Sequence, residues 1–214
     1  MANNRLTTAR IKNHLTYSWW KYLLCAVLCI LGVDLLFAVT AHRPPEEKKI
    51  ELYLCNGYAD ALALEEALWP ELSARYPGQE ELTVLNIDLT AGDIYAPMQF
   101  STYVAAQQGD VCLLPASEVS RMAGDDMASV FVDLTPYIES GVIDVSGLGD
   151  AQEALIPAAD GTGVYAIAAD SLRGLDAYGC DPTGAMLCVM HYCGNLDTAA
   201  GVVGMLIELF SGQA

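Results

Sequence analysis

The chain has 214 residues, with 27 acidic side chains against ten basic ones and a formal net charge of −17. This length suits one domain with a short extension. A hydrophobic content of 53% with only 17% charged residues excludes a disordered or collagen-like chain. The charge is uneven, because from Glu51 onward 24 acids face only three bases, Arg75, Arg121 and Arg173. A region this acidic repels phosphate backbones, so no nucleic-acid partner is expected.

The apolar segment from Trp19 to Ala41 predicts a helix that spans a membrane, since a bilayer requires about 20 such residues. Residues 1–18 contain Arg and Lys but no acid, so we expect them on the cytoplasmic side and the rest of the chain outside the cell. A cleaved signal peptide is the alternative, with Val39 and Ala41 at a small-residue cleavage site. The length of the apolar stretch favours an uncleaved, single-pass anchor in the cell membrane.

Asp34 is an ionisable residue inside this segment, where a charge costs about 2.5–3.5 kcal/mol. The helix can shift so that Asp34 approaches the outer interface, or the carboxyl can be protonated. Alternatively, Asp34 faces a polar group on another membrane helix. The last interpretation makes Asp34 a candidate contact with a partner such as a transporter permease or a second copy of the chain.

Residues 42–49 (HRPPEEKK) predict a polar tether stiffened by two prolines, and residues 50–214 predict one domain. Apolar periodicity predicts strands at 50–54, 82–89, 110–114, 164–168 and 185–192, and helices at 60–76, 97–108, 117–123 and 195–210. Pro70 is expected to kink or split the first helix, and Ser117 and Thr135 are expected as N-caps. The alternation predicts an α/β fold, with a mostly parallel sheet flanked by helices.

Motifs of catalysis are missing from the sequence. It contains no Walker A, G-x-S-x-G, H-E-x-x-H or S-x-x-K pattern, so we expect no enzyme and no cofactor. Five cysteines follow residue 50, and an odd number cannot all pair within the chain. A zinc site from Cys180, Cys188, His191 and Cys193 is disfavoured, because strand alternation places Cys188 opposite the other two nearby ligands. No metal is therefore expected.

Three segments resemble one family: GDVCLLPASEVSRMAG (109–124), FVDLTPYIESGVID (131–144) and GTGVYAIAAD (161–170). They are similar to extracellular solute-binding proteins of ABC importers, in particular the first lobe of the sugar/oligosaccharide-binding group. The resemblance implies a single periplasmic-binding-protein-like lobe, because residues 169–185 replace the whole second lobe. The lipobox cysteine typical of Gram-positive members is also missing, and Ala168 stands where the family usually has proline.

Two functions follow from this reading. The first is a membrane-anchored solute-binding-like module, accessory to an ABC-type importer, with a small solute such as a sugar bound weakly at the carboxyl ends of the strands. The candidate ligand contacts there are Asn56, Tyr58, Asp60, Asp88, Ser117, Glu118 and Asp170. Asp60 and Ser117 could equally be helix caps, and Asn56 could belong to a turn. The second function is a structural or protein-interaction ectodomain that has lost the ligand.

A simple feature separates the two functions. A concave pocket beyond the strand ends, with an exposed aromatic such as Tyr58, would favour solute binding. A flat and acidic surface there would favour the interaction ectodomain.

Overall fold

The computed structural model describes residues 8–40, 44–92, 94–124, 126–149, 151–158 and 161–212. The beginning of the predicted cytoplasmic segment and the junction of anchor and tether, residues 41–43, lie outside the described residues. The chain divides into two compact units, Met1–Arg43 and Pro44–Ala214. Each unit is described by itself.

The described part of the first unit is one helix, α1 (Thr8–Thr40). Its segment Trp19–Thr40 has a mean hydropathy of 2.6 over 22 residues, and its side chains, including that of Asp34, are exposed. A helix of this length and composition is consistent with a membrane anchor or a signal sequence.

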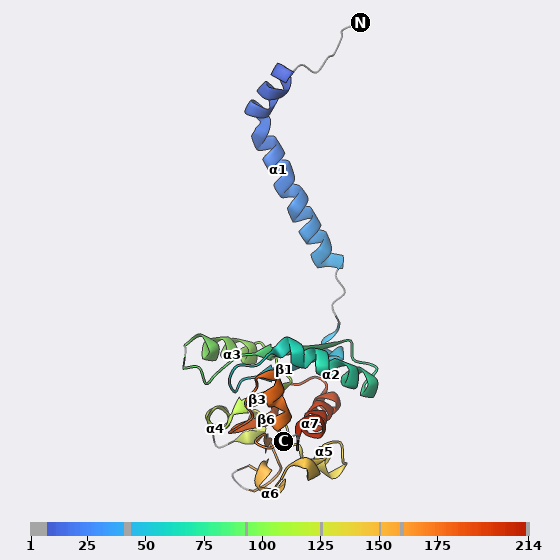
Figure 1. The fold of residues 1–214 in the computed structure, drawn as a ribbon, viewed down its shortest axis with the longest axis vertical. Helices are drawn as coiled ribbons and strands as arrows, with labels where there is room; N and C mark the ends of the chain where they lie inside the picture. Colours follow the sequence, from blue (N-terminus) through green and yellow to red (C-terminus); the bar gives the residue numbers. More distant parts are fainter. Residues whose placement is uncertain are drawn as a thin grey trace. The chain divides into compact units, whose positions relative to one another are not determined.

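The second unit is built on a six-stranded sheet in the order β2-β1-β3-β6-β5-β4 (Figure 1). Its strands are β1 (Lys49–Leu54), β2 (Glu81–Asn86), β3 (Val111–Pro115), β4 (Leu155–Ile156), β5 (Ala166–Ala168) and β6 (Ala185–Val189). The sheet is mixed, so the expectation of a mostly parallel sheet is wrong. Strand β1 is parallel to β2 and β3, whereas the pairs β3–β6, β5–β6 and β4–β5 are antiparallel. The chain enters β6 at the carboxyl end of β3, so β6 must run back along it, and apolar periodicity carries no information on strand direction.

The helices of the second unit are α2 (Ala61–Arg75), α3 (Tyr95–Ala105), α4 (Ala116–Ala123), α5 (Thr135–Glu139), α6 (Ala151–Ala154) and α7 (Leu196–Phe210). Short 3₁₀ turns occur at η1 (Glu46–Lys48), η2 (Met127–Ser129), η3 (Val145–Gly147) and η4 (Arg173–Tyr178).

Helix α2 is not split at Pro70, and the two N-cap expectations are wrong. Helix α2 continues through Pro70, because Pro70 and Glu66, whose carbonyl loses its partner, are both exposed and water can satisfy that carbonyl. Ser117 lies inside α4, whose N-cap is Pro115. Thr135 is the first residue of α5 and not its cap.

Two apolar cores cover the two faces of the sheet. On β1, Ile50, Leu52 and Leu54 belong to the core beneath α2 and α7. The alternate residues Tyr53 and Cys55 belong to the core beneath α3 and α4. This period-two division follows from the pleat of the strand, and it buries the sheet on both faces.

Two of the segments that carry the family resemblance pack against each other. Asp133 Oδ1 accepts hydrogen bonds from the backbone N–H groups of Thr135 (2.9 Å) and Val164 (3.0 Å). Burial alone would raise the pKa of Asp133, but these hydrogen bonds outweigh it and lower the pKa. Gly163 approaches so closely that an added Cβ would lie 2.9 Å from the Asp133 carboxyl carbon. These contacts give the two segments a structural role, because they join residues 133–135 to Val164, which precedes β5.

Candidate functional site

The structure gathers the seven predicted contact residues at one edge of the sheet. Strands β1, β2 and β3 are parallel, and β5 has the same direction as β3 because both are antiparallel to β6. Their carboxyl ends therefore meet at one edge, which we call the strand-end rim. It comprises Asn56, Tyr58, Asp60, Asp88, Ser117, Glu118 and Asp170.

The middle of the strand-end rim is occupied by the turn at residues 181–184. Asn56 is 8% exposed, and its Nδ2 donates to the backbone oxygens of Asp181 (2.8 Å) and Thr183 (3.1 Å). Asp170 Oδ1 accepts a hydrogen bond from the Gly184 N–H at 3.0 Å. Two of the predicted contact residues thus hold this turn in place.

Two further aspartates serve local structure. Asp60 is the N-cap of α2, and its Oδ1 accepts from the Ala63 N–H at 3.1 Å. Asp88 Oδ1 accepts from the Thr90 N–H (2.8 Å) and hydroxyl (2.6 Å). Burial alone would raise the pKa of Asp88, but hydrogen bonds from Thr90 and the Gly57 N–H lower it overall. Both carboxylates therefore accept hydrogen bonds from backbone N–H groups of their own segments.

The remaining rim residues are Glu118, Ser117 and Tyr58. Glu118 forms an ion pair with Arg121 one turn further along α4, with Oε2 2.8 Å from Nε. Ser117 is exposed, and Tyr58 is 73% exposed. Neither side chain has a hydrogen bond to any residue that the structure describes. Ligand contact at the seven rim residues stays a prediction, and five of them already have partners within the domain.

A pocket of about 350 Å³ lies beside one end of the rim. Asp170 lines it together with Ser171, Ala168 and residues of α6 such as Glu153. The hydroxyl oxygen of Ser171 is buried without a hydrogen-bond partner among the described residues. This pocket does not reach Tyr58, so the aromatic side chain and the hollow are separate features.

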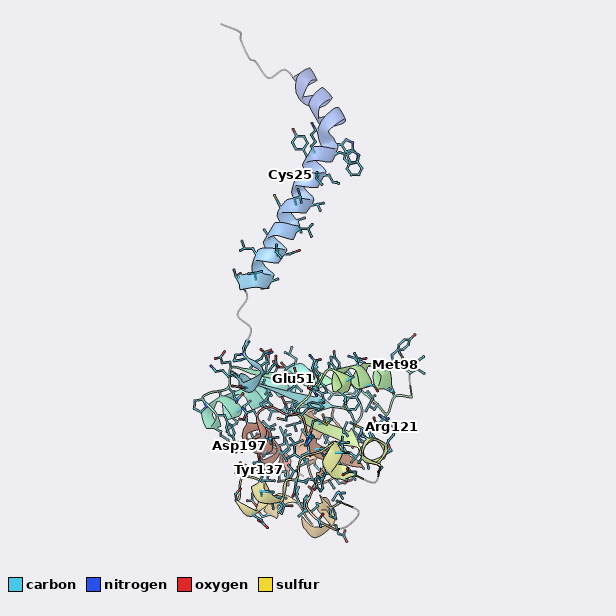
Figure 2. All side chains as sticks on the ribbon, turned by 180° about the vertical axis from the view of Figure 1, so that it is seen from behind. Cys25, Glu51, Met98, Arg121, Tyr137 and Asp197 are labelled. Atoms are coloured by element: carbon cyan, nitrogen blue, oxygen red, sulfur yellow. The ribbon has the colours of Figure 1, made fainter. Side chains whose placement is uncertain are left out.

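Apart from Tyr58, the exposed apolar side chains at this end of the sheet were not predicted from the sequence. Six large apolar side chains are exposed among the described residues after Pro44, and five of them lie at the starts of α2 and α3. We call these five the rim patch: Tyr58 (73% exposed), Leu62 (64%), Ile94 (70%), Tyr95 (73%) and Met98 (65%). Figure 2 shows Met98 on α3 at the outer edge of the domain. The two helix starts share one end of the sheet because they follow the parallel strands β1 and β2.

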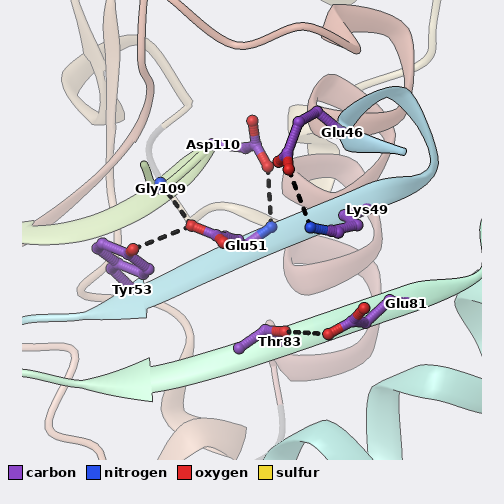
Figure 3. A network of polar contacts seen from close by, with 8 residues as sticks. All are labelled: Glu46, Lys49, Glu51, Tyr53, Glu81, Thr83, Gly109 and Asp110. Atoms are coloured by element: carbon purple, nitrogen blue, oxygen red, sulfur yellow. Dashed lines mark hydrogen bonds and ion pairs between the residues drawn. The ribbon is translucent and has the colours of Figure 1, made fainter. Parts of the chain in front are cut away.

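A polar network lies at the opposite, amino end of β1 (Figure 3). Glu51 Oε2 accepts hydrogen bonds from the Gly109 N–H (2.8 Å) and the Tyr53 hydroxyl (2.9 Å). Asp110 Oδ2 accepts from the Glu51 N–H at 2.9 Å, and burial raises the pKa of Asp110. The network ties β1 to the start of β3. Among the described residues, no group of three or more His, Cys, Asp or Glu side chains is arranged to hold a metal ion.

The five cysteines of the second unit are buried free thiols. Burial raises the pKa of Cys55, Cys112 and Cys188, which share the core beneath α3 and α4. A thiol with a raised pKa is a poor nucleophile. These cysteines pack as small apolar side chains.

The chain has a distant structural similarity to solute-binding proteins that hold sugars. Over 56% of its length it is similar to maltose-bound MalE3 of T. maritima, with 17% identity and a TM-score of 0.35, covering 28% of that chain. Over 56% it is also similar to the N-glycan transport solute binding protein NgtS of Streptococcus pneumoniae in complex with Man1GlcNAc, with 18% identity, a TM-score of 0.31 and 24% of that chain covered. The chain thus spans about a quarter of each structure's length. No protein-family model matches the chain, and no curated protein matches it.

Proposed function

We propose that the chain is a membrane-anchored ectodomain that docks another membrane protein through the rim patch. This is the second of the two functions that the sequence leaves open. The observation that carries it is the exposure of five large apolar side chains at the starts of α2 and α3, which share one end of the sheet although the two helices cover opposite faces. Large apolar side chains that are exposed together at one end of a domain are typical of protein-binding sites.

The polar groups of the strand-end rim support the same proposal. Asn56 and Asp170 hold the turn at 181–184, and Asp60 and Asp88 satisfy backbone donors of their own segments. A solute-binding cleft would need convergent polar groups that are available to the ligand. Burial of one large apolar side chain against a partner contributes about 1.5–3 kcal/mol. Contact of the rim patch with a protein surface should therefore contribute more binding free energy than contact of the polar rim residues with a sugar.

The acidic surroundings of the rim patch indicate the charge expected on the partner surface. Between Ile50 and Ser120 the chain has one basic residue, Arg75, at the far end of α2, where it pairs with Glu208 at 2.7 Å. Asp60 and Glu66 are exposed near Leu62. The expected partner presents apolar side chains edged by Lys or Arg, since opposite charge favours encounter and register. A second copy of this acidic domain is disfavoured, which leaves a transporter permease or another membrane protein as the expected partner.

The point where the tether joins the sheet leaves the rim patch accessible to a partner. It enters the sheet at Lys49, the amino end of β1, whereas the rim patch lies beyond the carboxyl end. The rim patch is thus not covered by the attachment of the tether. We propose that α1 remains as an uncleaved anchor, with its N-terminus in the cytoplasm and the second unit outside. Asp34 is then the candidate for a contact with a membrane helix of the partner.

Native gel electrophoresis of the full chain, extracted from its own membranes in mild detergent, tests the proposal. We expect the wild-type chain in a complex larger than a monomer. The double change Ile94→Ser with Met98→Ser should release most of it as monomer without changing the unfolding temperature of the domain. Val142→Ser is the matched control, because Val142 is an exposed apolar residue outside the rim patch. A wild-type monomer, or a double variant that keeps the larger species, would contradict the proposal.

A further inference from the structure

A hollow with an apolar floor lies away from the strand-end rim, between the second halves of α3 and α4. It has a volume of about 590 Å³, within the range of about 300–1,000 Å³ that is typical of small-molecule sites. The turn that follows β6, with Met190, His191 and Tyr192, closes a third side. Residues far apart in the sequence therefore build this hollow, which we call the α3–α4 pocket.

The floor of the α3–α4 pocket is apolar. Phe100 and Met190 are each 1% exposed and belong to the core beneath α3 and α4. Val104, Met122 and Val130 are partly buried and pack against the same core. The Tyr192 hydroxyl donates to the Gln108 backbone oxygen at 2.7 Å, so that the Tyr192 ring is fixed in place. An aliphatic or aromatic group placed here would bury its surface against side chains that are already ordered.

Two basic side chains lie at the mouth of the α3–α4 pocket, in contrast to the acidic domain around it. From Glu51 onward only three arginines and one histidine can carry a positive charge, and two of these four, Arg121 and His191, line this pocket. Arg121 (labelled in Figure 2) uses Nε and one terminal nitrogen for Glu118. Its other terminal nitrogen has donors left for a ligand. The structure shows no hydrogen bond to the His191 ring from any residue it describes, and the His191 side chain is exposed.

Gln107 adds a polar group with an unusual backbone. It lines the α3–α4 pocket and has a φ of +57°, the one positive φ of a non-glycine residue in the described part of the chain. Glycine is the usual residue at this position after a helix, because a side chain is strained there. With glutamine here instead of glycine, the backbone is strained, but a side-chain amide is present at the mouth of the pocket.

From these observations we propose that the α3–α4 pocket binds a small amphipathic carboxylate. Its apolar body lies on Phe100, Val104 and Met190, and its carboxylate lies between Arg121 and His191. This site is independent of the rim patch and goes beyond the docking function. Two hydrogen-bond-donating basic side chains in a domain this acidic favour an anion that is small enough to avoid the surrounding carboxylates, whereas an uncharged sugar would leave the apolar floor poorly covered.

Calorimetric titration of the full chain in zwitterionic lipid nanodiscs tests the proposal, with empty nanodiscs as background. The probe is 4-phenylbutyrate, and 4-phenylbutan-1-ol is its uncharged counterpart. We expect a dissociation constant on the order of 100 µM for the carboxylate and markedly weaker binding of the alcohol. Arg121→Gln and His191→Gln should each weaken carboxylate binding about fivefold or more. Arg75→Gln is the matched control, since it removes the same charge from α2 and should leave binding unchanged.

Gln107→Gly separates folding from binding. Glycine suits the φ of +57°, so this variant should unfold at a higher temperature than the wild type and still bind 4-phenylbutyrate more weakly. Three results would overturn the proposal. They are no heat above the empty nanodiscs, equal affinity for the carboxylate and the alcohol, or an Arg75→Gln effect as large as that of Arg121→Gln.

Discussion

Replacing Gly109 by alanine should destabilise the domain strongly. Gly109 has a φ of +89°, which disfavours an L side chain by about 1–2 kcal/mol. An added Cβ would also lie 2.7 Å from Cε2 and 2.9 Å from Cδ2 of Tyr53. The Tyr53 ring is 1% exposed and its hydroxyl is bonded to Glu51, so it cannot move aside without loss of packing. Overpacking of this kind costs about 1–3 kcal/mol, so the total loss should be about 2–5 kcal/mol.

Urea unfolding of residues 44–214 measures this loss, and two other glycines provide controls. Gly57 has a φ of +83° but nothing within 4 Å of an added Cβ, so Gly57→Ala should cost only the backbone part, about 1–2 kcal/mol. Gly78 has neither a positive φ nor a close neighbour, so Gly78→Ala should be within about 0.5 kcal/mol of the wild type. If Gly109→Ala costs no more than Gly57→Ala, the close packing of Tyr53 over Gly109 is refuted.

Three further predictions concern stability. Burial raises the pKa of Asp110, so the folded state favours the protonated carboxyl over the carboxylate. The contribution of this carboxyl to the free energy of unfolding is therefore full below the ordinary aspartate pKa of about 3.9, and it is lost as the pH rises through the raised pKa. The unfolding free energy of Asp110→Asn, measured in urea at pH 4 and pH 7, should therefore improve relative to the wild type at the higher pH, and an unchanged difference would contradict this. Asn56→Ala removes two hydrogen bonds to the turn at 181–184 and should cost about 1–3 kcal/mol in the same assay, with faster proteolysis at that turn; unchanged proteolysis would count against the role of Asn56. Residues 44–214 should fold alone as a soluble monomer in light scattering at neutral pH, since both faces of the sheet are covered, and aggregation would argue against an independent domain.

Much of the element order could be predicted because it depends on local periodicity. The alternation of Ile50, Leu52 and Leu54 with more polar neighbours predicts β1, and the stripe Leu64, Leu68 and Leu72 predicts α2. The direction of β6 could not be predicted, since a strand has the same pattern in either direction. Helix starts such as that of α4 were misplaced because Ser117 suits the first turn as well as the cap.

The position of the strand-end rim was predictable from the sequence, but the hydrogen-bond partners and the exposure of its residues were not. Topology alone brings the residues after β1, β2, β3 and β5 to one edge. The partners of Asn56 lie 125 and 127 residues further along the chain, and no sequence pattern reveals a contact at that separation. Leu62 did carry a signal, because it lies off the buried stripe of α2 and therefore had to be exposed. The α3–α4 pocket carried none, since it joins elements that only the fold brings together.

Site-specific photocrosslinking in the native membranes tests docking through the rim patch most directly. A photoreactive phenylalanine analogue replaces Met98, which is 65% exposed within the rim patch, or Ala74, an exposed residue near the end of α2. The account predicts one discrete crosslinked protein from position 98 and none from position 74, and the product should disappear when Ile94 is also replaced by serine. No product from position 98, or the same products from both positions, would contradict docking through the rim patch.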